Sequence, residues 1–252
     1  MRRLALLIIL PVSILLGATQ PRTYQTNFPA TENPMSENGN WINGKTVGLD
    51  WGDIQTIGGS PGHASGTNTS PNCQGNTLTG CDDSTAVLAG AWGPNQSACG
   101  TVYISPSLDR SGPFYEMELR LNTSISAHSI TGYEFNYSLH TSGTYAGIVR
   151  WNGPLDNFTP GIINLTNAPV LVNGDKLCIL RSGSTLTLTR NGTTLGSATE
   201  NTYTGGAPGI GMFNDSGALS DDTLYGFSSF QATDNGSNNP APPTNLRVTN
   251  VQ

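Results

Sequence analysis

Tyr115-Glu-Met-Glu-Leu-Arg-Leu121, Gly132-Tyr-Glu-Phe-Asn-Tyr-Ser-Leu-His140 and Tyr145-Ala-Gly-Ile-Val-Arg-Trp151 follow one another in the middle of the chain. In the first two segments, apolar and polar residues alternate strictly, which predicts half-buried β-strands. One face carries the apolar set: Tyr115, Met117, Leu119, Leu121, Tyr133, Phe135, Tyr137 and Leu139. The other carries the polar set: Glu116, Glu118, Arg120, Glu134, Asn136, Ser138 and His140. We expect the first face to line a core and the second to carry any binding or chemistry.

Short strands and turns continue along the rest of the chain, which has 252 residues with 31 Gly and 16 Pro. The clearest hairpin signal is Asn191-Gly192, between the alternating runs 185–190 and 193–198. No stretch has clear helical periodicity. The pattern therefore predicts an all-β, two-sheet antiparallel sandwich over residues 24–234.

The segments 49–57 and 161–165 are among the further predicted strands. Residues 58–80 have the Gly, Ser, Asn and Thr content of a loop, so we expect His63 within it to be a plain surface residue. We expect Trp51 to be a core residue.

The two ends of the chain differ from this domain. Arg2-Arg3, the apolar run 4–16 and small residues at 17–19 are typical of a secretory signal peptide over residues 1–19, with an uncleaved anchor as the alternative. Residues 235–243 have the composition of a linker. Residues 244–252 begin a new alternating strand. We therefore expect a secreted or cell-surface protein, free of the membrane after signal cleavage, with further domains in a longer chain.

Charge and cysteine content restrict the classes of partner. The net charge of −6 and the lack of a basic run argue against nucleic acid. In an exported protein the four cysteines, Cys73, Cys81, Cys99 and Cys178, indicate disulfides. Three pairings are possible, and we favour Cys73–Cys81 with Cys99–Cys178. The spacing of Cys and His argues against zinc. Loop acids at 82–83 and 221–222 are the kind that hold a structural Ca²⁺.

Several segments resemble the strands of concanavalin A-like (laminin-G-like) jelly rolls of bacterial secreted modules. They are the opening segment from Phe28 to Trp41 and the closing segments 174–181, 188–197, 203–213 and 224–234. The resemblance implies a jelly-roll sandwich, a fold shared by lectins, glucanases, lyases and adhesion modules, so it does not choose the function. The tail from Pro242 resembles the first strand of a fibronectin type III module.

Two catalytic hypotheses use the polar face. Glycoside hydrolysis needs two carboxylates, and Glu116 and Glu118 lie on one face about 7 Å apart along a strand. The laminarinase-type glucanases carry Glu-x-Asp-x-(x)-Glu, but Arg120 stands where the third acid is required.

The jelly-roll alginate lyases carry Arg-x-Glu-Leu-Arg, which the segment 116–120 matches only in part. His140 is a candidate for the base of a lyase.

The binding hypothesis uses aromatic rings and planar polar groups, which recognise sugars. Its candidates are Trp92, Glu118, Arg120, Glu134, Asn136, Tyr145, Arg150 and Trp151. We therefore expect a non-catalytic module that binds a polysaccharide, an oligosaccharide or a cell-surface glycan. A polysaccharide-degrading enzyme that uses Glu116, Glu118 and Arg120 is the first alternative. The second is a purely structural domain whose charged residues pair on a solvated sheet face.

Overall fold

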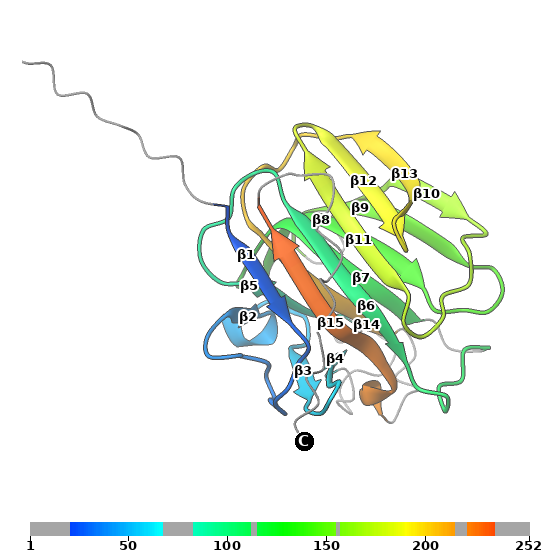
Figure 1. Cartoon of the computed structure of the whole chain (residues 1–252). Coiled ribbons are helices and arrows are strands. Elements are labelled where there is room, and N and C mark those ends of the chain that lie inside the picture. Colours follow the sequence, from blue (N-terminus) through cyan, green and yellow to red (C-terminus); the bar gives the residue numbers. More distant parts are fainter. Residues whose placement is uncertain (1–20, 68–82, 112–114, 155–156, 215–220, 235–252) are drawn as a thin grey trace, which may run out of the picture.

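The computed structural model describes residues 21–67, 83–111, 115–154, 157–214 and 221–234. These residues form two antiparallel sheets that pack face to face (Figure 1). The predicted all-β sandwich is therefore confirmed. The signal peptide, the linker, the fibronectin-like tail, Cys73 and Cys81 lie outside the described residues.

The first sheet has the strand order β13-β12-β11-β6-β15-β4-β3, and β1 also pairs with β15. In Figure 1, β15 runs between β1 and β6. The strands of this sheet are β1 (Thr23–Thr26), β3 (Ile54–Ile57), β4 (His63–Gly66), β6 (Ser97–Ile104), β11 (Lys176–Ser182), β12 (Thr185–Arg190), β13 (Thr193–Thr199) and β15 (Tyr225–Thr233).

The second sheet has the strand order β10-β9-β8-β7-β14-β5-β2. Its strands are β2 (Trp41–Asn43), β5 (Asp83–Leu88), β7 (Tyr115–Ser126), β8 (Ser129–Ser138), β9 (Tyr145–Gly153), β10 (Phe158–Thr166) and β14 (Ala207–Asn214). Within the described ranges, two short 3₁₀ helices, η1 (Lys45–Val47) and η3 (Asp222–Leu224), lie between strands.

The core lies between the sheets and contains the apolar face predicted from the alternation. All eight predicted wall residues on β7, on β8 and just after β8 are at most 1% exposed. They pack with residues of the first sheet such as Ile179, Leu188 and Phe227. Burying one large apolar side chain contributes roughly 1.5–3 kcal/mol, so this wall holds the two sheets together.

The hairpin between β12 and β13 also forms as predicted. Asn191 and Gly192 both have positive φ, +51° and +79°. A two-residue turn with this backbone matches the twist of the flanking strands.

Two segments differ from the sequence-based expectation. Of the predicted strand over residues 49–57, only residues 54–57 form a strand, which is β3. The preceding residues do not continue it, because Leu49 and Trp51 pack on the second sheet instead. Residues 63–66, predicted as loop, form β4. His63, expected to be a plain surface residue, is half-buried, stacks on Tyr103 at 4.0 Å and contacts the Thr223 carbonyl at 2.9 Å.

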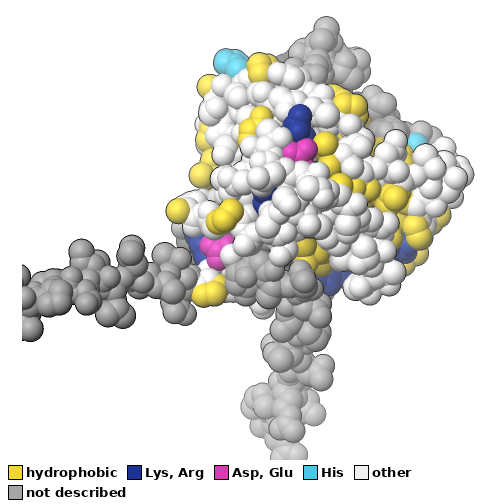
Figure 2. Space-filling model, turned by 90° about the horizontal axis from the view of Figure 1, so that it is seen from above, with side chains coloured by type: hydrophobic (Ala, Val, Ile, Leu, Met, Phe, Trp, Pro, Cys, Tyr) yellow, Lys and Arg dark blue, Asp and Glu magenta, His cyan; other side chains and the backbone are white. Residues whose placement is uncertain are grey.

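A disulfide joins Cys99 of β6 to Cys178 of β11, directly opposite each other in the first sheet. This is one of the two predicted bridges. Charged side chains are sparse on the face shown in Figure 2, where most of the described surface is uncharged. Among the described residues, no helix is both long and apolar enough to cross a membrane.

Replacing both Cys99 and Cys178 with alanine tests the contribution of this bridge to stability. The cysteines are 79 positions apart, and cross-links of this kind restrict the unfolded chain and contribute about 2–4 kcal/mol. We expect a loss of that size in the free energy of unfolding, measured by urea denaturation. A loss well below ~1 kcal/mol would contradict the expected role.

Candidate functional site

Strand register brings the polar residues of β7, β8 and β9 together on the outer face of the second sheet. Glu116 pairs with Ser138, Glu118 with Asn136, and Arg120 with Glu134. Directly opposed residues in antiparallel strands point to the same side of the sheet. The alternation in the sequence therefore yields one continuous polar layer opposite the core.

Arg120 is the centre of this layer and is fully buried. Its Nη1 donates to Glu134 and its Nη2 donates to Glu118. Its Nε donates to Thr85 Oγ1 at 3.2 Å, and Asp83 lies 4.0 Å from Nη2. We call Glu116, Glu118, Arg120, Glu134 and Asp83 the arginine–carboxylate cluster.

Two tryptophans lie against this cluster. The guanidinium of Arg120 stacks on Trp51, 4.9 Å from the ring centroid. Trp51 meets Trp151 edge to face at 4.7 Å, and Trp151 Nε1 donates to Glu134. With Leu49 and Ile130 the tryptophans form a small second apolar cluster. The segment around Trp51 thus shields the cation from water, which strengthens its attraction to the carboxylates.

A glycine on the neighbouring strand gives the cluster its space. Gly211 of β14 lies opposite Glu118. A Cβ at position 211 would stand 2.2 Å from Glu118 Oε2 and 2.7 Å from Arg120 Nη2. Any larger residue would therefore displace the ion pair.

The cluster holds four acids but only one arginine, and this excess of buried acids raises the pKa of some of its carboxyl groups. Burial, followed by the nearby Glu134 charge, raises the pKa of Glu116 to about 8. Burial also raises the pKa of Glu118 well above its ordinary value, although Arg120 opposes the shift. Burial disfavours the charge on Arg120, but Glu118 and Glu134 outweigh it and raise its pKa. Tyr145 donates to Glu116, and burial and that carboxyl raise the tyrosine pKa.

This burial corrects two expectations from the sequence. Glu118, Arg120 and Glu134, expected to bind ligand, are 1%, 0% and 4% exposed. They contact one another and their protein neighbours instead of facing solvent. The alternative of charged residues that pair across strands on a solvated sheet face is right about the pairing of Arg120 with Glu134 and wrong about the solvent.

Partly accessible residues lie beside the cluster, on β8, β9 and β10. Asn136 and Tyr145 are half-buried, and Asn164 of β10 is exposed. Gly147 stands between the two asparagines, because it pairs with Asn136 on one side and Asn164 on the other. We call Asn136, Gly147, Asn164 and Tyr145 the amide row.

The remaining predicted site residues are not part of the amide row. Trp92 is in the core cluster, only 8% exposed. Arg150 is the strand partner of Tyr133, so it lies on the face of the sheet opposite to the arginine–carboxylate cluster. There it forms an ion pair with Glu200 at 2.9 Å. His140 is half-buried two residues beyond Ser138, past the end of β8. Trp151 lies on the polar face but is 7% exposed.

Three contributors were not assigned to the site from the sequence. Trp51 was expected to be a core residue, and it is buried, but it packs on the polar face. Thr85 and Asn164 carry no local signal, because only strand pairing brings them to this face. Asn164 could have been found by extending the predicted strand 161–165 into register with β9.

Of the described residues, Glu116, Glu118 and Glu134 form a group that could hold a metal ion, with one oxygen of each within 4.8 Å of the others. The guanidinium of Arg120 already binds two of these carboxylates, so it competes with any cation. The acids expected to bind Ca²⁺ contact protein donors: Asp221 accepts from the Thr223 amide at 2.9 Å and Asp222 from Asn214 at 2.9 Å. Asp82 lies outside the described residues, and the calcium site stays a prediction.

No family model and no curated protein matches the sequence. Among solved structures, the carbohydrate recognition domain of Emp46p in its potassium-bound form is 12% identical, with a TM-score of 0.51 over 83% of this chain and 95% of that chain. The carbohydrate-binding module CBM66 from Bacillus subtilis is 13% identical, with a TM-score of 0.45 over 80% and 96%. A β-glucanase from Bacillus licheniformis is 12% identical, with a TM-score of 0.46 over 84% and 94%.

At this level of identity the likeness concerns the fold alone. The chain has the concanavalin A-like jelly-roll fold that the strand resemblances implied.

Replacing Arg120 with methionine tests whether the cluster is held by its cation. The change leaves buried carboxylates without a partner, and removing one member of a buried ion pair costs about 3–5 kcal/mol. We expect a loss of that size in urea denaturation, and a smaller loss in Arg120→Met combined with Glu118→Gln. Arg150→Met removes a partly exposed pair and is the control, with an expected loss of about 0–1 kcal/mol. Equal losses in Arg120→Met and Arg150→Met would contradict a buried cluster.

The pH dependence of stability follows from Glu116. Its pKa rises from 4.5 to about 8 on folding, so between these values the folded state binds more protons than the unfolded state. Stability should therefore fall as pH rises from 4.5 to 8, with a slope of up to about 1.4 kcal/mol per pH unit for one such group. Glu116→Gln should flatten this slope in urea denaturation at several pH values. Asp109→Asn, at an exposed acid, should leave it unchanged; an unchanged slope in Glu116→Gln would refute the assignment.

Proposed function

We propose that this chain is a secreted, non-catalytic carbohydrate-binding module and that the amide row contacts the glycan. The observation that carries the proposal is the position of Gly147 between two asparagines. Because Gly147 has no side chain, the Ile163 carbonyl and the Asn136 amide oxygen can lie against it, where a Cβ would stand 2.6 Å and 3.3 Å from them. The amides of Asn136 and Asn164 on either side can donate to and accept from sugar hydroxyls. Tyr145 adds an aromatic ring at the edge of the row.

The arginine–carboxylate cluster lies beside this row. Glu118 is the strand partner of Asn136, and Glu116 accepts a hydrogen bond from Tyr145, so two contact residues adjoin buried acids. Residues held in this way lose little freedom on binding, which favours affinity. Glu118, Arg120, Glu134 and Trp151 thus act as positioning residues in the proposal. The sugar-binding names of the structural neighbours agree with this class of ligand.

A glycan array tests the proposal. Asn136→Ala and Asn164→Ala should each weaken binding about tenfold, because each removes a hydrogen-bonding group worth about 1.5 kcal/mol. Thr187→Ala, on the outer part of the first sheet, is the matched control and should bind as the native chain does. Native binding in both asparagine variants would contradict the amide row, and an array without signal would favour a purely structural domain.

Glycan cleavage is a second candidate function. Glu116, with a pKa of about 8, has the protonation state of a general acid at neutral pH. Its carboxyl oxygen lies within 4.8 Å of oxygens of Glu118 and Glu134, close to the ~5–5.5 Å separation of retaining glycosidases. Burial of all three carboxyls argues against substrate access and places this function second.

Assays for new reducing ends and for unsaturated uronate absorbance separate the two functions. Under the binding proposal, neither product forms with any polysaccharide on the array. Turnover that disappears in Glu116→Gln would replace the binding proposal with the enzymatic one.

A further inference from the structure

A cavity of about 340 Å³ lies on the first sheet, away from the amide row. It is bounded by β1, β15, β6 and β11, and its lining includes Gln25, Cys99, Thr101, Lys176, Ser229 and Gln231. Its volume is at the lower end of the ~300–1,000 Å³ of small-molecule sites. One sugar ring is an occupant of suitable size.

One side of the cavity is formed by β1 and by Asn27, which follows it. β1 pairs with β15 only from Thr23 to Thr26, while β15 begins at Tyr225. Phe28 has a φ of +52° and is fully buried, so the chain turns into the core just after β1. β1 therefore borders the cavity only through Gln25, Thr26 and the following Asn27.

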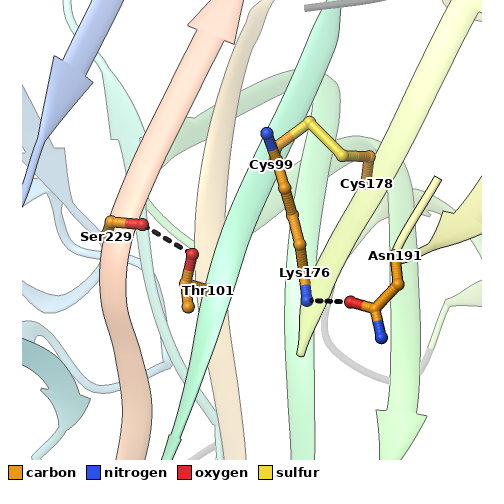
Figure 3. The surroundings of a disulfide bond; sticks show 6 residues. All are labelled: Cys99, Thr101, Lys176, Cys178, Asn191 and Ser229. Atoms are coloured by element: carbon orange, nitrogen blue, oxygen red, sulfur yellow. Dashed lines mark hydrogen bonds between the residues drawn. A yellow bond between two sulfur atoms is a disulfide. The ribbon is translucent and has the colours of Figure 1, made fainter. Parts of the chain in front are cut away.

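The floor of the cavity combines a disulfide with several polar side chains. The disulfide between Cys99 and Cys178 ties β6 to β11, and Thr101 and Ser229 join their hydroxyls at 2.8 Å across β6 and β15 (Figure 3). Gln25 and Gln231 are opposite each other on β1 and β15. Hydroxyls and amides on adjacent strands can satisfy the several hydroxyls of a sugar ring.

Lys176 is the charged group of the cavity. In Figure 3 its side chain extends along the strands toward the disulfide. The lining contains no acid, and within the described part of the chain no carboxylate lies within ion-pair distance of Lys176. The adjacent acid, Asp175, is bound to Arg190 at 2.6 Å and to Asn191 at 2.7 Å. A local positive charge in a chain of net charge −6 favours an anionic ligand at this place.

We propose that this cavity is a second ligand site, specific for a sugar unit that carries a carboxylate, with Lys176 as the carboxylate partner. Gln25, Gln231, Thr101 and Ser229 contact the ring hydroxyls. Burial lowers the pKa of Lys176, and a bound carboxylate would raise it again. The site lies on the other sheet from the amide row and does not depend on the function proposed for that row.

Titration of the full folded chain with glucuronate, followed by NMR, tests this site. We expect shift changes at Lys176 and Gln231, at least tenfold weaker binding of glucose and of acetate, and a rise in the Lys176 pKa on binding. Glucose lacks the carboxylate, and acetate lacks the hydroxyls. Equal affinity for acetate and glucuronate would mean a simple anion site and would overturn the proposal, as would equal affinity for glucose.

Variants separate this site from the amide row. Lys176→Met should weaken glucuronate binding at least tenfold, Lys176→Arg should retain much of it, and Gln231→Ala should weaken it about threefold. Asn136→Ala should leave glucuronate binding unchanged. Loss of glucuronate binding in Asn136→Ala, or native binding in Lys176→Met, would refute the second site. A melting temperature close to native in each variant excludes unfolding as the cause.

Discussion

The guanidinium of Arg120 lies between the carboxylates of Glu118 and Glu134, and this buried ion pair network constrains the second sheet. Ionised carboxylates are costly to remove from water unless a cation and hydrogen bonds compensate for the loss. Arg120 is suited to this role because its planar donors bind two acids at once, while its face stacks on Trp51. A lysine could not replace it, because an ammonium group has neither the planar set of donors nor a flat face that stacks on a ring.

Several features of the fold are arranged around this arginine. The segment that contains Trp51 does not form the predicted strand. It packs on the polar face, next to Trp151. Gly211 has no side chain where the Glu118–Arg120 pair lies. The excess of acids is accommodated by protonation, since Glu116 has a pKa of about 8. The polar face therefore acts mainly as a second, charged core, and the proposed glycan contacts lie at its accessible edge.

The short strands and turns along the chain were enough to predict the sandwich, and the alternation in residues 115–121 and 132–140 predicted its core wall and the set of polar residues that share one face. The alternation did not predict that the polar face is buried, because the residues that cover Arg120 are distant in the sequence. Trp51, for example, is 69 positions before Arg120. Arg150 was predicted to bind ligand together with Glu134 and Asn136, but its pairing with Tyr133 puts it on the opposite face of the sheet. The cavity beside Lys176 is bounded in part by β1, and a four-residue strand with no strong pattern was not predicted.

Side-chain NMR of the arginines tests the central claim, a buried arginine–carboxylate cluster, most directly. The Nε and Nη protons of Arg120 should exchange with solvent as slowly as the amides of the central strands, because the guanidinium is fully buried and bound on several sides. Arg150, whose side chain is 23% exposed, supplies the internal comparison. Exchange at Arg120 as fast as at Arg150 would contradict the account and return the whole polar face to solvent.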